Sequence, residues 1–115
     1  MIKGHATCEG TIKFASKNRE AGRNHFRTFN GLKLSSIGMG TYLGNLNDTT
    51  DILVTKAVKK SVLSGINVID TAINYRSQKA ERSVGKAISE LLEEGNVKRE
   101  EIFISTKNGY LTNDG

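Results

Sequence analysis

Three polar side chains follow apolar runs at two points of the chain and could act together on a proton. The run Ile66–Ile69 leads directly to Asp70, and Tyr75 comes five residues later. A second run, Ile102–Thr106, leads to Lys107. In parallel α/β folds the strands are continuous apolar runs, and functional groups gather at the carboxyl ends of the strands. We therefore expect a carboxylate, a phenol and an ammonium to meet at one edge of a sheet.

Proton delivery is the chemistry that such a trio can perform. A phenol has a pKa of about 10, so it is a poor acid near neutrality unless its anion is stabilised. A nearby ammonium stabilises that anion, and a carboxylate paired with the ammonium keeps it charged and oriented. These rules predict Tyr75 as the acid, Lys107 as its modulator and Asp70 as the orienting group. A reductase needs such a unit to protonate a carbonyl oxygen while a hydride reaches the carbonyl carbon.

The strands that must position these groups are predicted from hydrophobic patterns and turn residues. Alternating residues around Asn30-Gly31 predict a β-hairpin over 26–34, because both turn residues tolerate positive φ. Apolar runs at 37–41, 66–69 and 102–106 predict three further strands. The glycines of the 37–41 run are expected to let something approach its backbone closely.

Two helices are predicted between these strands, because apolar side chains recur at the spacing of one helical face. Asp48 or Thr49 is the expected N-cap of the first helix and Ser77 that of the second, and Gly65 and Gly95 fit their ends. The positions on the two faces are Val54, Ala57, Val58, Ser61 and Val62 within 51–64, then Ala80, Val84, Ala87, Ile88, Leu91 and Leu92. This alternation predicts an α/β fold with right-handed crossovers and a parallel sheet. Both faces of such a sheet need covering, and two helices cannot cover both faces of three strands well.

The basic charge is concentrated near the N-terminus. The 115 residues carry a formal net charge of +5, and residues 1–27 hold six basic and two acidic side chains. No nucleic-acid reader motif accompanies this charge, so nucleic-acid binding is not predicted. No apolar run approaches the ~20 residues that span a membrane, and residues 1–27 lack the apolar stretch of a secretory signal. We expect a cytoplasmic protein whose first 25 residues form a mobile or loosely attached arm.

No metal site is predicted. His5 and Cys8 are spaced like half of one, but the sequence has no second pair and zinc needs three or four ligands. The single cysteine cannot form an internal disulfide, which agrees with a reducing compartment.

Other dinucleotide-binding arrangements fit less well. The glycine-rich stretch 38–44 resembles a Rossmann fingerprint, with Asp70 where an acid that binds the ribose would lie. Its third glycine comes one residue late, however, and residues 45–50 separate the turn from the helix that should meet the pyrophosphate. Tyr75 and Lys79 also have the tyrosine and lysine spacing of short-chain dehydrogenases, in which the pair lies on a long helix. A Rossmann-type fragment is therefore the lesser alternative.

Five motifs in order resemble the aldo-keto reductase family. They are Ile37-Gly-Met-Gly-Thr41, Val68-Ile-Asp-Thr-Ala72, Tyr75, Glu81-Arg-Ser-Val-Gly85 and Glu101-Ile-Phe-Ile-Ser-Thr-Lys107. The Asn30-Gly31 hairpin is similar to the one that closes the bottom of the family's (β/α)8 TIM barrel. The resemblance covers residues 27–111. It implies that 26–115 form an incomplete barrel (a hairpin and the first three strands with two helices between them), preceded by a basic N-terminal extension, 1–25.

The resemblance also implies a function, the NAD(P)H-dependent reduction of aldehydes or ketones to alcohols. The family's catalytic residues fall on Asp70, Tyr75 and Lys107, and its cofactor contacts fall on Gly40, Thr41, Tyr42 and Asp70. NADPH is favoured over NADH as the cofactor. The carbonyl substrate and the oligomeric state are not predicted. From the residues alone, Tyr42 fits a core aromatic with a wet hydroxyl nearly as well as a cofactor contact.

Two departures from the family pattern affect these expectations. Arg76 stands where many members have Gly or Gln, which leaves the environment that faces the substrate open. The family's catalytic histidine lies on the next strand, beyond Gly115, and His5 and His25 cannot replace it by position. We therefore expect an N-terminal fragment that is poorly stable alone or folds with a partner. The alternative function is a non-catalytic truncated product or interaction fragment.

Overall fold

A computed structural model of the chain describes residues 2–22 and 24–108, so the end of the predicted barrel segment, 109–115, lies outside the described residues. The helices are α1 (Cys8–Lys17), α2 (Asp48–Leu63) and α3 (Lys79–Glu93), with short 3₁₀ turns η1 (Arg19–Ala21) and η2 (Arg99–Glu101). The strands are β1 (Phe26–Phe29), β2 (Leu32–Ser35), β3 (Met39–Gly40), β4 (Val68–Asp70) and β5 (Phe103–Ser105). The predicted α/β order is confirmed, with strands shorter than the apolar runs.

The chain forms two sheets. β1 and β2 make an antiparallel hairpin in which Phe29 pairs with Leu32 across the turn. Asn30 and Gly31 have positive φ, 49° and 81°, as the predicted two-residue turn requires. β3, β4 and β5 form a parallel sheet in that order, which confirms the predicted sheet.

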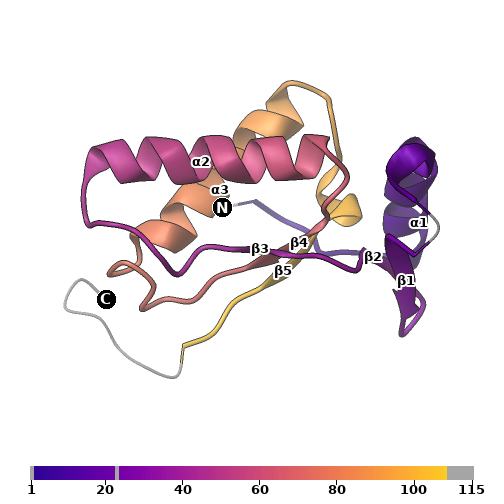
Figure 1. The fold of residues 1–115 in the computed structure, drawn as a ribbon, viewed down its shortest axis with the longest axis horizontal. Helices are drawn as coiled ribbons and strands as arrows, with labels where there is room; N and C mark the ends of the chain where they lie inside the picture. The colour runs from indigo at the N-terminus through magenta and orange to yellow at the C-terminus, as the bar shows by residue number, and fades with distance from the viewer. Residues whose placement is uncertain (1, 23, 109–115) are drawn as a thin grey trace.

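Helices α2 and α3 lie over one face of the parallel sheet (Figure 1). Met39, Ile69 and Ile104 are in register and pack into or against the core beneath these helices. The buried core consists of Phe14, Val58, Val62, Ile69, Val84, Ala87, Ile88, Leu91, Val97 and Ile102. Because strand side chains alternate in direction, the residues next to Ile69 point away from the helices, and they are only half-buried. Within the described residues, the other face of the sheet is therefore not fully covered, which agrees with the expectation that two helices cannot cover both faces of three strands well.

The apolar faces of both helices are confirmed, whereas both predicted N-caps are wrong. The side chain of Asn47, the residue before α2, accepts a hydrogen bond from the Thr50 amide at 2.8 Å and caps the helix. Before α3 the chain is left-handed at Ser77 and Gln78, and neither side chain caps that helix. Gly65 and Gly95 follow the helix ends with positive φ, as expected. No helix in the described ranges is long and apolar enough to cross a membrane.

The N-terminal extension is not a loosely attached arm, so that prediction is wrong. Residues 8–17 fold as α1, whose Phe14 ring is 1% exposed in the core. The Thr11 hydroxyl accepts a hydrogen bond from the Lys33 amide at 2.9 Å, which ties α1 to the hairpin. Lys17 forms an ion pair with the buried Glu101 at 2.6 Å. The sequence contains little sign that α1 packs on the core, because Phe14 is the single large apolar residue that α1 buries.

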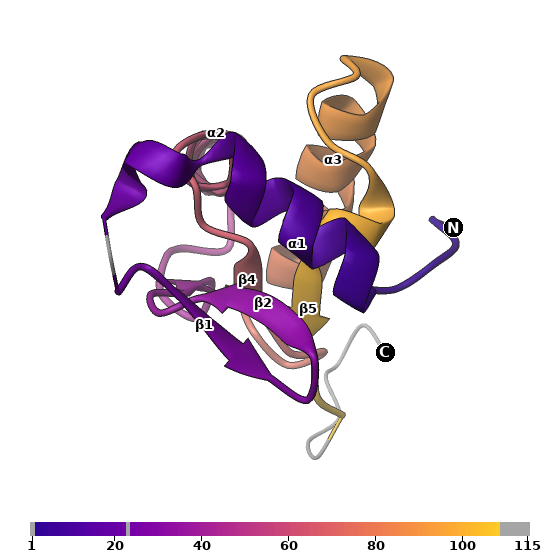
Figure 2. The same cartoon turned by 90° about the vertical axis from the view of Figure 1, so that its right-hand side faces the viewer.

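Asn67 joins the hairpin to the amino end of the parallel sheet. It is fully buried, and its Oδ1 accepts a hydrogen bond from the Ser35 amide at 2.8 Å. Its Nδ2 donates to the carbonyls of Lys33, at 3.0 Å, and Glu101, at 3.1 Å. Figure 2 shows α1 lying across the hairpin at this end of the molecule. The amino ends of the strands are thus closed, and the residues that follow the strands emerge at the opposite end.

Candidate active site

The carboxyl ends of the three parallel strands lie side by side. Gly40 pairs with Asp70, and Asp70 pairs with Ser105. The pairing continues beyond the strands, because the Ile73 amide donates a hydrogen bond to the Lys107 carbonyl at 2.9 Å. This register is what brings the residues after β3, β4 and β5 to one rim.

Lys107 and Asp70 form an ion pair on this rim. Lys107 Nζ donates hydrogen bonds to Asp70 Oδ1 and to the Thr71 carbonyl, each at 2.8 Å. The hydrogen bond that Lys107 donates to Asp70 is the main reason that the pKa of Lys107 lies above its ordinary value, while partial desolvation opposes the rise and nearby Tyr75 adds to it. Both side chains are about half exposed. Exposed pairs contribute little to stability, so the consequence of this pair is a fixed ammonium at neutral pH.

Tyr75 lies beside that ammonium. It belongs to the loop 71–78 between β4 and α3, and Lys107 Nζ lies 4.9 Å from the centroid of its ring. A cation in this position is attracted to the aromatic ring. The structure therefore brings together the three side chains of the predicted trio.

Tyr42 makes an aromatic pair with Tyr75 across two loops. The ring centroids are 5.1 Å apart and the rings are inclined at 80°, which is the edge-to-face arrangement that aromatic pairs favour. Tyr42 is 63% exposed, so the alternative interpretation as a core aromatic is wrong. Its side chain is accessible on the rim.

The two residues before Tyr42 differ in what surrounds them. Thr41 is buried, and its hydroxyl donates a hydrogen bond to the Asp70 carbonyl at 2.9 Å. Gly40 is exposed, and among the residues that the structure describes no atom lies within 4 Å of the place where a Cβ would be. At Gly38 a Cβ would lie 3.2 Å from Val68, so what approaches that glycine is β4. Thr41 thus holds β3 to β4, whereas Gly40 leaves open space at the strand end.

Arg76 is the rim residue whose position the sequence did not predict. Arg76 belongs to the loop 71–78, and its side chain, which is 1% exposed, reaches the loop 41–47. The guanidinium donates hydrogen bonds to the Asn45 carbonyl, at 2.9 Å, and to Asp51, at 2.5 Å. The sequence feature that could have indicated this position is Asp51 in the first turn of the predicted helix, because a carboxylate can form an ion pair with an arginine.

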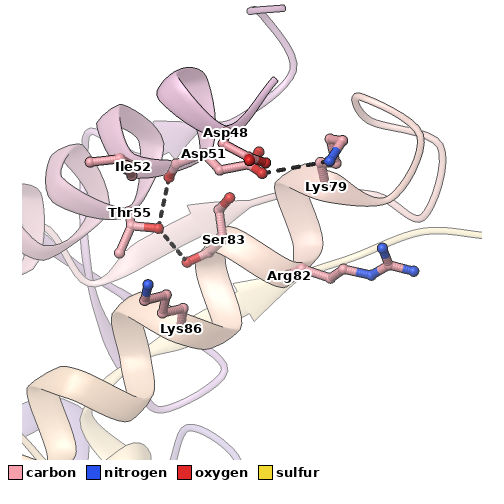
Figure 3. A pocket seen from close by; sticks show the side chains of 8 residues that line it. All are labelled: Asp48, Asp51, Ile52, Thr55, Lys79, Arg82, Ser83 and Lys86. Atoms are coloured by element: carbon pink, nitrogen blue, oxygen red, sulfur yellow. Dashed lines mark hydrogen bonds and ion pairs between the residues drawn. The ribbon is translucent and has the colours of Figure 1, made fainter. Parts of the chain in front are cut away.

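A separate groove between α2 and α3 contains none of the predicted site residues (Figure 3). It combines acidic side chains of α2 with basic ones of α3, among them Asp51 and Lys79, which lie 3.7 Å apart. The Thr55 hydroxyl also donates to the Asp51 carbonyl at 2.8 Å. The groove is a helix-packing surface with mixed charge. In residues 2–22 and 24–108, no three His, Cys, Asp or Glu side chains are grouped so as to hold a metal ion.

Comparison with known sequences identifies the family. Residues 36–114 match the sequence model of the Aldo/keto reductase family, and this span contains every residue of the rim. The chain belongs to the aldo/keto reductase family. The family predicted from the five motifs is thereby confirmed.

Curated aldo/keto reductases and related oxidoreductases match the same region. The chain is 31% identical over 93 residues to aldose reductase C of Dictyostelium discoideum, covering 80% of this chain and 26% of that protein. It is 37% identical over 90 residues to aldo-keto reductase family 1 member D1 of Rattus norvegicus, covering 78% and 26%. It is 39% identical over 77 residues to glycerol 2-dehydrogenase (NADP(+)) of Saccharomyces cerevisiae, covering 67% and 21%. The chain thus spans 21–26% of the length of these relatives.

Proposed function

We propose that this chain carries the proton-delivery part of an NAD(P)H-dependent aldo-keto reductase, which reduces an aldehyde or ketone to an alcohol. One observation supports the proposal above all others. The ammonium of Lys107 lies 2.8 Å from Asp70 Oδ1 and 4.9 Å from the centroid of the Tyr75 ring, within the span that matches the family.

The proposed roles follow from this arrangement. Tyr75 is the general acid, and its phenolic proton passes to the oxygen of the substrate carbonyl. The electron pair that stays on the phenolate is stabilised by the ammonium of Lys107, which keeps its own proton. Asp70 holds Lys107 in the charged form and fixes its position through the 2.8 Å hydrogen bond. Solvent then returns a proton to Tyr75.

Gly40, Thr41, Tyr42 and Asp70 are the proposed contacts to the cofactor. The open space at Gly40 and the exposed ring of Tyr42 fit a flat group lying against the rim. A nicotinamide cofactor, when bound, supplies the hydride that reaches the carbonyl carbon. The name of the yeast relative specifies NADP(+), and this favours NADPH over NADH for this chain.

The same proposal assigns the fold. Residues 26–115 would be the N-terminal part of a (β/α)8 barrel, and residues 1–25 an extension that precedes it. The parallel order β3-β4-β5, with α2 and α3 on one face, is what a barrel requires, because its strands point their other side chains inward. Asp70 and Lys107 then lie at the carboxyl rim, where such barrels carry their active sites.

Binding of NADPH tests the proposal. The sequence has three tyrosines and no tryptophan, and Tyr42 and Tyr75 are both on the rim, so quenching of tyrosine fluorescence reports binding there. We expect saturable quenching by NADPH, with a Kd that rises at least tenfold in Lys107→Met, because Asp70, a proposed cofactor contact, then loses the ammonium that fixes its position. The matched control is Lys86→Met, because Lys86 is an exposed lysine in the groove between α2 and α3.

A different outcome would favour the second candidate, a non-catalytic interaction fragment. The observation in its favour is that the Asp70–Lys107 pair is about half exposed and that the sheet face bearing Asp70 is only half-buried. Absence of saturable quenching at millimolar NADPH would contradict the reductase proposal. Equal affinity for NADPH in Lys107→Met and Lys86→Met would contradict the proposal that the cofactor binds at the rim.

A further inference from the structure

The Arg76 side chain is buried although it lies beside an exposed rim. Only 1% of it is accessible, and its two bridging contacts reach a carbonyl in one loop and a carboxylate in a helix. A buried guanidinium is costly unless it is paired and hydrogen-bonded, and its planar fork suits two acceptors in fixed directions. Its position is therefore closely determined by Asn45 and Asp51.

These contacts connect the two loops that carry the rim tyrosines. Arg76 directly follows Tyr75 in the loop 71–78, whereas Asn45 belongs to the loop 41–47, which begins at the end of β3 and also carries Tyr42. The second loop packs closely around the arginine. At Gly44, a Cβ would lie 3.5 Å from both Cδ and Nε of Arg76 and 2.7 Å from Thr50. Arg76 thus acts as a cross-link between the loops.

The backbone around Arg76 has an unusual conformation. Arg76, Ser77 and Gln78 have φ of 51°, 53° and 73°, a left-handed run without a glycine. Such residues are uncommon and persist where surrounding contacts hold them. The hydrogen bonds of the Arg76 side chain to Asn45 and Asp51 are contacts of this kind, because Arg76 is the first residue of the left-handed run.

Asp51 connects this cross-link to the rest of the fold. It lies in the first turn of α2, and it also approaches Lys79 of α3 at 3.7 Å (Figure 3). An acidic residue in the first helical turn is itself favoured by the helix dipole. The arginine is therefore anchored to both helices that cover the sheet.

We propose that Arg76 is a positioning residue, which sets the Tyr75 ring between Tyr42 and Lys107 by cross-linking the loops 41–47 and 71–78. The importance of this position for catalysis rests on the proposed function, but the placement of the ring does not. Arg76 touches neither substrate nor the reacting proton. It acts through the backbone of Tyr75 and through the loop that carries Tyr42.

The placement can be measured by NMR on the full chain with labelled tyrosine and lysine. Two signals report it, namely the nuclear Overhauser effect between the Tyr42 and Tyr75 rings and the upfield ring-current shift of the Lys107 ε-protons. Tyr75→Ala gives the zero point of both signals. Amide signals of the β1–β2 hairpin report whether the fold is intact.

We expect Arg76→Ala to lose the contact between the rings and to move the Lys107 ε-protons toward their position in Tyr75→Ala, with the hairpin signals unchanged. Arg76→Lys keeps a positive charge but lacks the planar fork whose separate nitrogens, Nε and Nη2, reach the Asn45 carbonyl and Asp51. It should therefore lose the same signals while remaining folded. Arg27→Ala is the matched control, because Arg27 is an exposed arginine on β1 and should leave both signals unchanged.

The outcomes separate positioning from simple stabilisation. Persistence of the ring contact and the lysine shift in a folded Arg76→Ala or Arg76→Lys would overturn the proposal. Loss of the hairpin signals in both variants would also overturn it, because the arginine would then stabilise the whole fold. Neither readout needs a cofactor, so loss of the ring contact together with absent NADPH binding would uphold the positioning role and reject the reductase.

Discussion

The two ends of the parallel sheet differ in how their polar groups are used. At the amino end, Asn67 is fully buried and satisfied by three hydrogen bonds, and Glu101 is 1% exposed and paired with Lys17. At the carboxyl end, Asp70 and Lys107 are about half exposed and are paired mainly with each other. The amino end thus uses polar groups to hold α1 and the hairpin in place, whereas the carboxyl end leaves them accessible.

This difference separates stability from chemistry within one short sheet. Removal of a buried, hydrogen-bonded group leaves its partners unsatisfied and costs folding free energy, whereas an exposed ion pair contributes little. Substitutions at the amino end should therefore change stability and those at the carboxyl end should change binding and protonation.

The largest effect is expected at Phe14. Truncation to alanine removes a 1%-exposed ring from the core and should destabilise the chain by about 3–5 kcal/mol, enough to unfold a marginally stable domain. Ile12→Ala, on the same helix but 51% exposed, is the control and should cost far less. Urea unfolding followed by circular dichroism measures both. Equal effects would mean that α1 is not docked.

A somewhat smaller effect is expected at Asn67. Alanine in its place leaves the Ser35 amide and the carbonyls of Lys33 and Glu101 without this partner, and should cost about 2–4 kcal/mol. The control is Asn96→Ala, since Asn96 is exposed. Hydrogen exchange should show faster exchange at the Ser35 amide. Unchanged protection there would contradict the assigned network.

A small effect on stability is expected at Tyr42. Tyr42→Ala loses an edge-to-face contact with Tyr75, worth about 0.5–1.5 kcal/mol, while the 63%-exposed ring buries little area. Leu43→Ala, 81% exposed, is the neighbouring control. The Tyr75 ring signals should shift in Tyr42→Ala alone. If Tyr42→Ala lost as much stability as Phe14→Ala, the carboxyl end of the sheet would contribute to stability as the amino end does, and the proposed difference between the two ends would be wrong.

The hairpin, the three strands and the two covering helices could be predicted because each carries its own local signal. Asn30-Gly31 specifies the turn, and the apolar spacing in α2 and α3 specifies their buried faces. The trio of Asp70, Tyr75 and Lys107 was also predictable, because parallel strands in register must present their ends together.

What could not be predicted depends on contacts between distant segments. The docking of α1 rests on Phe14 and on Lys17 reaching Glu101, and no local pattern reveals either. The same is true of Arg76, whose partners Asn45 and Asp51 lie 31 and 25 residues earlier. The cap of α3 was missed because the chain is left-handed at Ser77 and Gln78, and neither side chain caps the helix.

The most direct test of the central claim is the titration of Lys107, followed by NMR of its ε-carbon. The claim is that Asp70 and Tyr75 hold the charge of Lys107, so its pKa lies above the ordinary value and the pair is fully formed at neutral pH. Above neutrality, the contribution of the pair is lost as the pH rises through that elevated pKa. Asp70→Asn should lower the pKa of Lys107, and Tyr75→Phe should lower it less. Unchanged titration of Lys107 in Asp70→Asn would contradict the account.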